Sequence, residues 1–181
     1  MKKQLALAVA TMLSVGMGAA HAADGTINFT GTVTADTCTV SVNDQTNPTL
    51  NLGTVNTADL ATQGDTGPAA NFNLNLTSCP NTVTAASVTF SGNQDAGLDT
   101  AFSNEAGAAD AAKNVGVQLY DASNATVSPD TAVDVSSYLT PNSDNTAESA
   151  SIPFTARMIA VADAATAGSL VSHADYTISY Q

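Results

Sequence analysis

The chain has 181 residues and a formal charge of −12 at pH 7, because 16 Asp and Glu residues outnumber four Lys and Arg residues. Such an acidic chain repels nucleic acid and anionic lipid, which argues against either as a partner. Charged residues make up only 11% of the sequence. The abundance of Thr, Asn, Ser, Ala and Val is more typical of a β-rich exported protein than of a helical one.

The first 22 residues have the three parts of a secretory signal peptide. Lys2 and Lys3 provide a positive start, residues 5–17 are mostly apolar, and Ala20 and Ala22 form a small-residue cleavage pattern. The alternative is a membrane anchor, but the apolar run is short for a bilayer and no stop-transfer charges follow it. We therefore expect cleavage after Ala22, which leaves 159 of the 181 residues and, without the two lysines, lowers the formal charge from −12 to −14. That length suits one domain with no membrane insertion.

The mature chain begins almost directly with an apolar strand. In residues 25–33, GTINFTGTV, the side chains of Ile27, Phe29 and Val33 fall on one face and Thr and Asn side chains fall on the other. This period of two predicts a half-buried β-strand. The strand precedes the first cysteine, so the sheet with which it pairs has to be identified.

The next feature is a pair of cysteines, Cys38 and Cys79, the only two in the chain. In the oxidising compartment that an exported chain enters, one structural disulfide is expected. It closes a loop of about 42 residues, which the chain-entropy account values at roughly 4 kcal/mol. The mature chain has a single histidine, His173, and no C-x-x-C spacing. We therefore expect no metal site and no cofactor.

The rest of the chain reads as short strands separated by Gly, Asn, Asp, Ser and Pro clusters. Residues 92–113 are small and polar, and we expect a loop there with at most one helical turn at 105–112. Many short strands with turns between them predict an antiparallel β-sandwich. After the first strand, the predicted strands are 38–42, 49–55, 71–79, 87–90, 114–121, 132–139, 151–161 and 174–181.

The sequence offers little material for catalysis. Without a free thiol and with one histidine, the usual nucleophile and base pairs are missing, so we do not expect an enzyme. Asp121, Asp130 and Asp134 lack the spacing of a calcium loop and are read as turn residues. Arg157 lies in an otherwise apolar strand, where a structural residue that snorkels or pairs with one acid is favoured over a functional one.

The last predicted strand runs to the C-terminus with no turn after it. Its residues Tyr176, Ile178 and Tyr180 share one face, and Gly168 lies fourteen residues from the end. A sandwich that stops at this strand lacks a seventh strand, so we expect the edge of the last strand to be unpaired.

Several stretches together resemble a pilin subunit of the chaperone–usher class, closest to the type 1 fimbrial major subunits. They cover nearly the whole mature chain and add to the cysteine pair, the penultimate Tyr180 and the position of Gly168. The stretches are GTINFTGTVTADTC, LNLGTVNTADLATQGD, FNLNLTSC, NVGVQLYD, IPFTARMIA and ADYTISYQ.

The resemblance implies an incomplete immunoglobulin-like sandwich that lacks its last strand and is completed by a donor strand from another protein. It divides the chain into a signal peptide (1–22), a donor-strand extension (23–34) and a pilin domain (35–181). The implied edge strand of the open groove, which a chaperone also reads, carries Gly168, Tyr176, Ile178 and Tyr180. The implied donor residues are Gly25, Ile27, Phe29, Gly31 and Val33.

The implied function is that of a structural subunit of an adhesive surface fimbria. Its implied partners are copies of itself, other fimbrial subunits, a periplasmic pilus chaperone and an outer-membrane usher. It would be exported through the periplasm to the cell surface. A minor adaptor subunit of the same fimbria is the first alternative, and a secreted carbohydrate-binding sandwich or enzyme is a more distant one.

Overall fold

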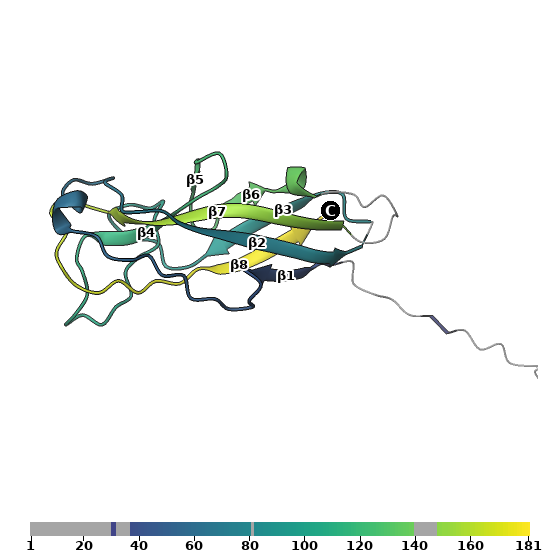
Figure 1. Cartoon of the computed structure of the whole chain (residues 1–181), viewed down its shortest axis with the longest axis horizontal. Helices are drawn as coiled ribbons and strands as arrows, with labels where there is room; N and C mark the ends of the chain where they lie inside the picture. Colours follow the sequence, from purple (N-terminus) through teal and green to yellow (C-terminus); the bar gives the residue numbers. More distant parts are fainter. Residues whose placement is uncertain (1–29, 32–36, 81, 140–147) are drawn as a thin grey trace, which may run out of the picture. The chain divides into compact units, whose positions relative to one another are not determined.

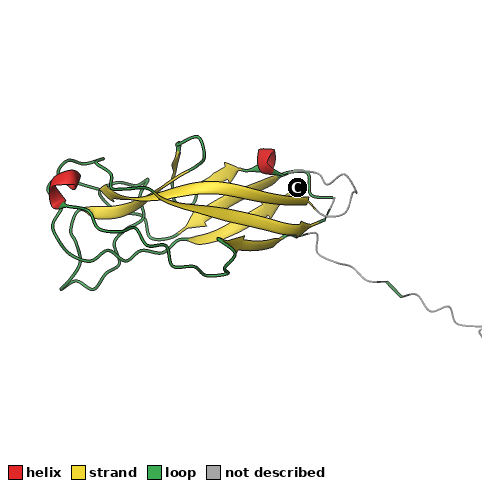
Figure 2. Ribbon diagram, in the orientation of Figure 1, coloured by secondary structure: helices red, strands yellow, loops and turns green. Residues whose placement is uncertain are grey.

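The structure is a computed structural model, which describes residues 30–31, 37–80, 82–139 and 148–181. The chain divides into two units, residues 1–34 and 35–181, and every element named below belongs to the second. Figures 1 and 2 show this second unit as two layers of strands with short helical turns. Within the described ranges, no helix is long and apolar enough to cross a membrane.

Eight strands and two 3-10 helices make up the described part of the second unit. The 3-10 helices are η1 (Thr57–Leu60) and η2 (Ser136–Tyr138). The strands are β1 (Thr39–Val42), β2 (Ala70–Cys79), β3 (Ala86–Ser91), β4 (Val115–Tyr120), β5 (Thr126–Val127), β6 (Ala132–Asp134), β7 (Glu148–Ala160) and β8 (Asp175–Tyr180).

The strands form two sheets in which every pair is antiparallel. The larger sheet has the order β1-β2-β7-β4-β5 and the smaller has the order β6-β3-β8. The long strands β2 and β7 pair at the centre of the larger sheet, with Phe72 opposite Phe154 and Leu74 opposite Ile152. In the smaller sheet Val88 of β3 lies opposite Ile178 of β8. The predicted antiparallel sandwich is confirmed.

The core lies between the two sheets and follows from the alternation of the strands. Leu74 and Leu76 of β2 and Val88 of β3 are all 0% exposed, because side chains at every second position turn to the same face of a sheet. Three rings join the layers: Phe90 of β3 lies edge-on to Phe154 of β7, with centroids 5.1 Å apart, and edge-on to Phe72 of β2 at 6.4 Å. Such edge-to-face pairs add to the stabilisation that area burial gives.

One predicted strand is wrong. Residues 49–55 alternate as a strand would, yet they join neither sheet. Gly53 has a φ of +77°, and its N–H donates to the side-chain oxygen of Asn51 at 2.8 Å, so the backbone turns locally here. Leu50 and Leu52 still pack against the core. The alternation therefore indicates which side chains face the core. It does not indicate whether the backbone forms hydrogen bonds with another strand.

Two further differences lie between β4 and η2. The predicted strand 132–139 is a strand only over β6, because the Asp134 carboxylate accepts the Ser136 N–H at 2.9 Å and the chain turns into η2. The two-residue strand β5 was not predicted.

The loop at 92–113 is confirmed, and its helical turn is limited to bonds from the N–H groups of Asp110 and Ala111 to the Gly107 carbonyl.

Candidate functional site

Strand β8 has one paired edge and one open edge. The residues Gln181 and Ala85 exchange both of their backbone hydrogen bonds, at 2.9 and 3.1 Å. Because an antiparallel ladder alternates bonded and non-bonded pairs, the ladder places Ser179, Thr177 and Asp175 in the bonded positions toward β3. The N–H and C=O groups of Tyr176, Ile178 and Tyr180 therefore point away from β3, where no other strand of the described residues pairs with β8.

The same three residues turn their side chains toward the core. Tyr176, Ile178 and Tyr180 are half-buried and pack against the main core cluster, whereas Asp175, Thr177 and Ser179 between them are exposed. A strand laid along this edge would meet free backbone groups in its plane and apolar side chains beneath it. This is the arrangement that β-strand addition requires.

Strand β1 forms the facing margin of the other sheet and is less open. The Asn43 N–H donates to the Asn73 carbonyl at 2.9 Å, which fixes the hydrogen-bonded positions of the β1–β2 ladder. The backbone N–H and C=O groups of Val40 and Val42 therefore point away from β2. Val42 already exchanges bonds of 2.8 and 3.0 Å with Gln45. Only Val40 is left with unused backbone groups on this side, so β8 is the better acceptor of a strand.

Among the described residues, one side-chain hydrogen bond spans the open margin. The Tyr176 hydroxyl donates to the Thr46 carbonyl oxygen at 3.2 Å and so ties β8 to the loop that follows β1. Leu50 and Leu52 pack against the core from the same stretch of chain. Sequence reasoning did not assign Thr46, Leu50 or Leu52 to the site, although the alternation of 49–55 was the signal that the two leucines face inward.

The Tyr180 hydroxyl is buried and makes no hydrogen bond with any residue that the structure describes. Burial raises the pKa of this hydroxyl above its usual range, since the charged form would lose hydration. The Cys38 backbone N–H opposes part of this rise, but its geometry falls short of a hydrogen bond. A buried polar atom without a hydrogen-bond partner destabilises the fold. The hydrogen-bonding capacity at this end of β8 is therefore not fully used.

The predicted disulfide is confirmed. The sulfur atoms of Cys38 and Cys79 are 2.02 Å apart, and both residues are buried in the core cluster that also contacts Tyr180. The bond joins the residue ahead of β1 to the last residue of β2. It therefore fastens the short edge strand to the central part of the larger sheet.

Gly168 lies seven residues ahead of β8 and not within it. A Cβ atom there would come within 2.3 Å of the Ala112 nitrogen, so the close approach of two backbones requires glycine. The neighbouring Ser169 carbonyl accepts the Ala112 N–H at 2.9 Å. The role of Gly168 in the edge strand of a groove stays a prediction.

The predicted donor residues Gly25, Ile27, Phe29 and Val33 lie outside the described residues, as does the predicted signal peptide. Gly31 is described, and it is exposed and in no strand. The structure therefore leaves the donor assignment as a prediction.

Arg157 and His173 have structural partners. The Arg157 guanidinium donates to the Gly67 carbonyl at 3.2 Å and lies 6.0 Å from the centre of the Tyr120 ring, so aromatic and backbone contacts replace the single acid that was considered. The exposed His173 ring nitrogen Nδ1 lies 2.6 Å from the Glu105 carboxylate. This contact and a bond from Asn93 lower the pKa of Glu105.

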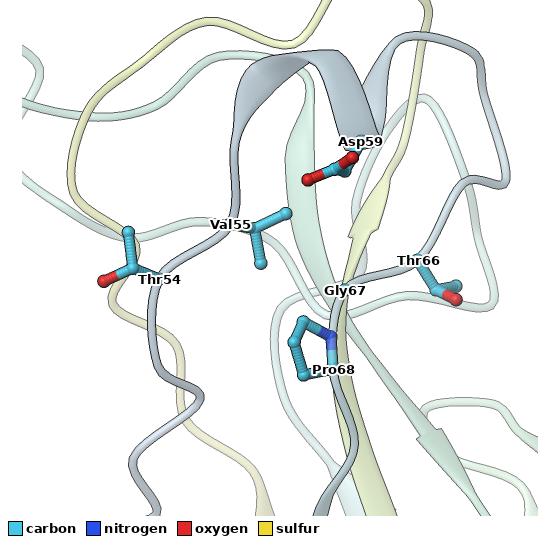
Figure 3. Close-up of a pocket in the computed structure, with 6 residues that line it drawn as sticks. All are labelled: Thr54, Val55, Asp59, Thr66, Gly67 and Pro68. Atoms are coloured by element: carbon cyan, nitrogen blue, oxygen red, sulfur yellow. The ribbon is translucent and has the colours of Figure 1, made fainter.

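A shallow hollow of about 500 Å³ lies between the chain ahead of η1 and the approach to β2. Figure 3 shows Val55, Asp59 and Pro68 on its walls. Asp59 is the only titratable group among the lining residues, so the hollow holds no pair of catalytic groups. Over the described ranges, no cluster of three or more His, Cys, Asp or Glu residues is suited to a metal ion.

Comparisons with known proteins agree with this geometry. The family described as "Fimbrial protein" matches residues 27–181. The type-1 fimbrial protein, A chain, of Escherichia coli strain K12 is 37% identical over 186 aligned residues, which cover 99% of this chain and 98% of that protein.

Two solved structures share the fold. An antigen and type I fimbria protein of Burkholderia pseudomallei superposes with a TM-score of 0.58 at 26% identity, over 86% of this chain and 97% of that one. A subunit of a chaperone–usher pilus superposes with a TM-score of 0.60 at 18% identity, over 88% and 96% of the two chains. The two-sheet sandwich with its open β8 edge is thus the incomplete immunoglobulin-like fold that the resemblance implied, and the chain belongs to the fimbrial protein family.

Proposed function

We propose that this chain is a structural subunit of an adhesive surface fimbria and polymerises head to tail by donor-strand exchange. Residues 23–34 of one subunit lie along β8 of the next and complete its smaller sheet. The subunit is exported by its signal peptide, held in the periplasm by a chaperone and passed to an outer-membrane usher. The observation that carries the proposal is the open edge of β8, with free backbone groups above half-buried apolar side chains.

The energetics of the open margin favour strand addition. Each backbone hydrogen bond that a new strand makes with Tyr176, Ile178 or Tyr180 contributes roughly 0.5–1.5 kcal/mol net. Each fully buried apolar side chain of the donor, such as Phe29, contributes roughly 1.5–3 kcal/mol. The donor and acceptor are different surfaces of the same chain, and such a heterologous contact builds open filaments instead of closed dimers.

The test is a pair of neighbouring substitutions in the donor segment. Phe29→Ala removes an inward side chain, which typically costs ~3–5 kcal/mol when buried, whereas Thr30→Ala changes the opposite face. We expect Phe29→Ala to abolish detergent-resistant multimers and Thr30→Ala to retain them. Equal multimer yields from the two variants, measured by electrophoresis without boiling, would contradict the donor assignment.

Chaperone capture is tested on β8 itself. Tyr180→Ala removes a half-buried ring at the open edge, and Thr177→Ala removes an exposed methyl and hydroxyl from the outer face of the same strand. We expect the first variant to co-purify with the periplasmic chaperone in much smaller amount than the second. Normal recovery and normal fibres from Tyr180→Ala would show that β8 is not the recognised element.

A further inference from the structure

Strand β7 is longer than the strand that pairs with it on the side away from β2. It spans 13 residues, but β4 pairs with it only from Thr155 onward, and Figure 1 shows β7 continuing past the end of β4. The β4 ladder ends at Tyr120 because the chain then turns. The Asp121 N–H donates to the Ala125 carbonyl at 2.9 Å, and the Asp121 carboxylate accepts the Ala125 N–H at 2.8 Å. The first half of β7 therefore has no second strand partner among the described residues.

The β2–β7 register determines which backbone groups of β7 lie on this open side. Asn73 lies opposite Pro153, and both of its backbone groups are bonded to Asn43. Its carbonyl accepts the Asn43 N–H, and its N–H donates to the Asn43 side-chain oxygen, each at 2.9 Å. Asn73 and Pro153 are therefore a non-bonded pair of the ladder, as are Asn75 and Ser151. The backbone groups of Ser151 and Pro153 thus point away from β2, to the side that β4 does not reach.

A hollow of about 200 Å³ lies beside this edge. Its lining includes Val133 of β6 and Ile152 and Phe154 of β7, so apolar side chains from both sheets border it. Unpaired backbone groups next to apolar side chains are the features that suit β8 to strand addition. The first half of β7 is therefore a second edge on which an extended segment could pair.

The two edges differ in one backbone donor. On β8 the outward residues Tyr176, Ile178 and Tyr180 each offer an N–H and a C=O group. On β7 the exposed Pro153 offers only its C=O group, and its ring occupies the place of the missing N–H. A strand laid along β7 would meet this ring and would leave one of its own carbonyls without a donor, which disfavours pairing. The β2–β7 ladder loses no bond to the proline, because the Pro153 nitrogen faces away from β2.

We infer that Pro153 restricts strand addition to β8 and so determines which edge the donor segment 23–34 occupies. The inference rests on the proposed donor-strand exchange, for which it identifies a specificity-determining residue. With an N–H group at position 153, the donor of one subunit would have two competing edges on the next. A donor bound along β7 would not complete the smaller sheet, because β8 belongs to that sheet and β7 to the other. The proline therefore leaves β8 as the productive edge.

The test restores the missing N–H group. Pro153→Thr places a residue favoured in strands at this position. The control Pro68→Thr makes the same change at an exposed proline that lies in neither sheet. A double variant adds Ser151→Pro to Pro153→Thr, which moves the proline two residues along the same edge.

Each exported chain is purified as detergent-resistant multimers, in which β8 is occupied under the proposed function. A labelled synthetic peptide of residues 23–34 is then added. The amount of bound peptide per subunit is measured, and hydrogen exchange followed by mass spectrometry locates the binding site.

We expect Pro153→Thr to bind at least about tenfold more peptide than the unmodified chain, since one further net hydrogen bond changes an association constant by about that factor. The peptide should slow hydrogen exchange over β7 and leave exchange over β8 unchanged. Pro68→Thr and the double variant should bind no more peptide than the unmodified chain. Pro153→Ala restores the same N–H group and replaces Pro153→Thr if circular dichroism shows that the latter does not fold.

The inference is overturned if restoring the N–H group does not increase peptide binding, if the unmodified chain binds peptide along β7, or if the double variant still binds it. Detergent-resistant multimers of the unmodified chain report separately on head-to-tail exchange. If they form and peptide binding does not change, this inference alone fails. If they do not form, donor-strand exchange and this inference fail together.

Discussion

The two long margins of the sandwich differ in how completely they are closed. On one margin β4 pairs with β5, and the chain continues into β6 and η2, so that Val127 and Val135 are 2% and 1% exposed. The edge strands β5, β6, β1 and β8 each have one partner, but on the other margin Ile178 of β8 stays half-buried although it lies opposite the fully buried Val88.

The treatment of polar groups differs in the same way. Near the closed margin the buried Gln118 side chain accepts the Thr100 hydroxyl at 2.9 Å and donates to the Thr100 carbonyl at 2.7 Å and to the Val127 carbonyl at 3.3 Å. At the open margin the buried Tyr180 hydroxyl has no hydrogen-bond partner among the described residues. The comparison teaches that strands of similar alternation can end at a margin where side chains are fully buried and buried polar groups are bonded, or at one where neither holds. The difference lies in whether further chain covers the margin.

The largest expected effect comes from releasing the open margin. Replacing both Cys38 and Cys79 by Ala removes a link across 41 residues, which should lower the free energy of unfolding by about 4 kcal/mol. Denaturant unfolding followed by circular dichroism measures the change. Thr39→Ala, on the exposed face of β1, is the control and should shift stability by less than about 0.5 kcal/mol. An unchanged midpoint in the double variant would show that β1 is held without the disulfide.

A paired truncation sharpens the comparison directly. Ile152→Ala removes a side chain that is 2% exposed in the closed part of the core and should cost ~2–5 kcal/mol. Ile178→Ala removes a half-buried one and should cost less in the isolated subunit, roughly 1–2 kcal/mol.

A peptide of residues 23–34 should then raise the cost of Ile178→Ala toward that of Ile152→Ala, because the added strand buries the site. The measurement is the unfolding free energy with and without peptide. Equal costs in the isolated subunit would mean that the margin is already closed.

A smaller effect is expected from the single bond that spans the open margin. Tyr176→Phe removes the hydroxyl that donates to Thr46 and should destabilise the isolated subunit by roughly 0.5–1.5 kcal/mol. Tyr138→Phe is the matched control, since the Tyr138 hydroxyl near the closed margin makes no hydrogen bond with a described residue. Equal melting temperatures for the two variants would show that the Thr46 contact adds nothing.

The smallest effect is a pH dependence. The hydrogen bond from His173, with a second from Asn93, lowers the pKa of Glu105 below its usual 4.5. A lowered carboxyl pKa stabilises the fold above pH 4.5, and this contribution is lost as pH falls through the folded pKa. Glu105→Gln should therefore flatten the stability profile below pH 4.5. An identical acid profile for the variant and the unmodified chain would exclude this contribution.

Strong alternation made the fold largely predictable from sequence. The alternation that includes Leu74 and Leu76 predicts β2, and the alternation from Tyr176 to Tyr180 predicts β8. In both strands one buried face imposes a period of two. The segment at 49–55 was misjudged because Leu50 and Leu52 are partly buried against the core without being in a ladder. The two residues of β5 are too few to produce a period at all.

The candidate site was predictable in its side chains and not in its backbone. The inward residues of β8 follow from alternation, but which N–H and C=O groups stay free depends on the ladder register with β3. The bond from Tyr176 to Thr46 joins residues 130 positions apart, and no local pattern reports such a contact. The hydrogen bonds between Val42 and Gln45 occupy backbone groups at the outer edge of β1. They depend equally on how the chain turns after that strand.

The disulfide also determines how a filament would bear tension. A pull on the chain ahead of residue 37 reaches the folded domain at Cys38, before the four-residue strand β1 begins. The covalent link passes that load to Cys79 at the end of the ten-residue strand β2, which pairs along most of its length with β7. In the proposed filament, shear would thereby be carried by the ladder between β2 and β7, and the short edge strand β1 would be bypassed.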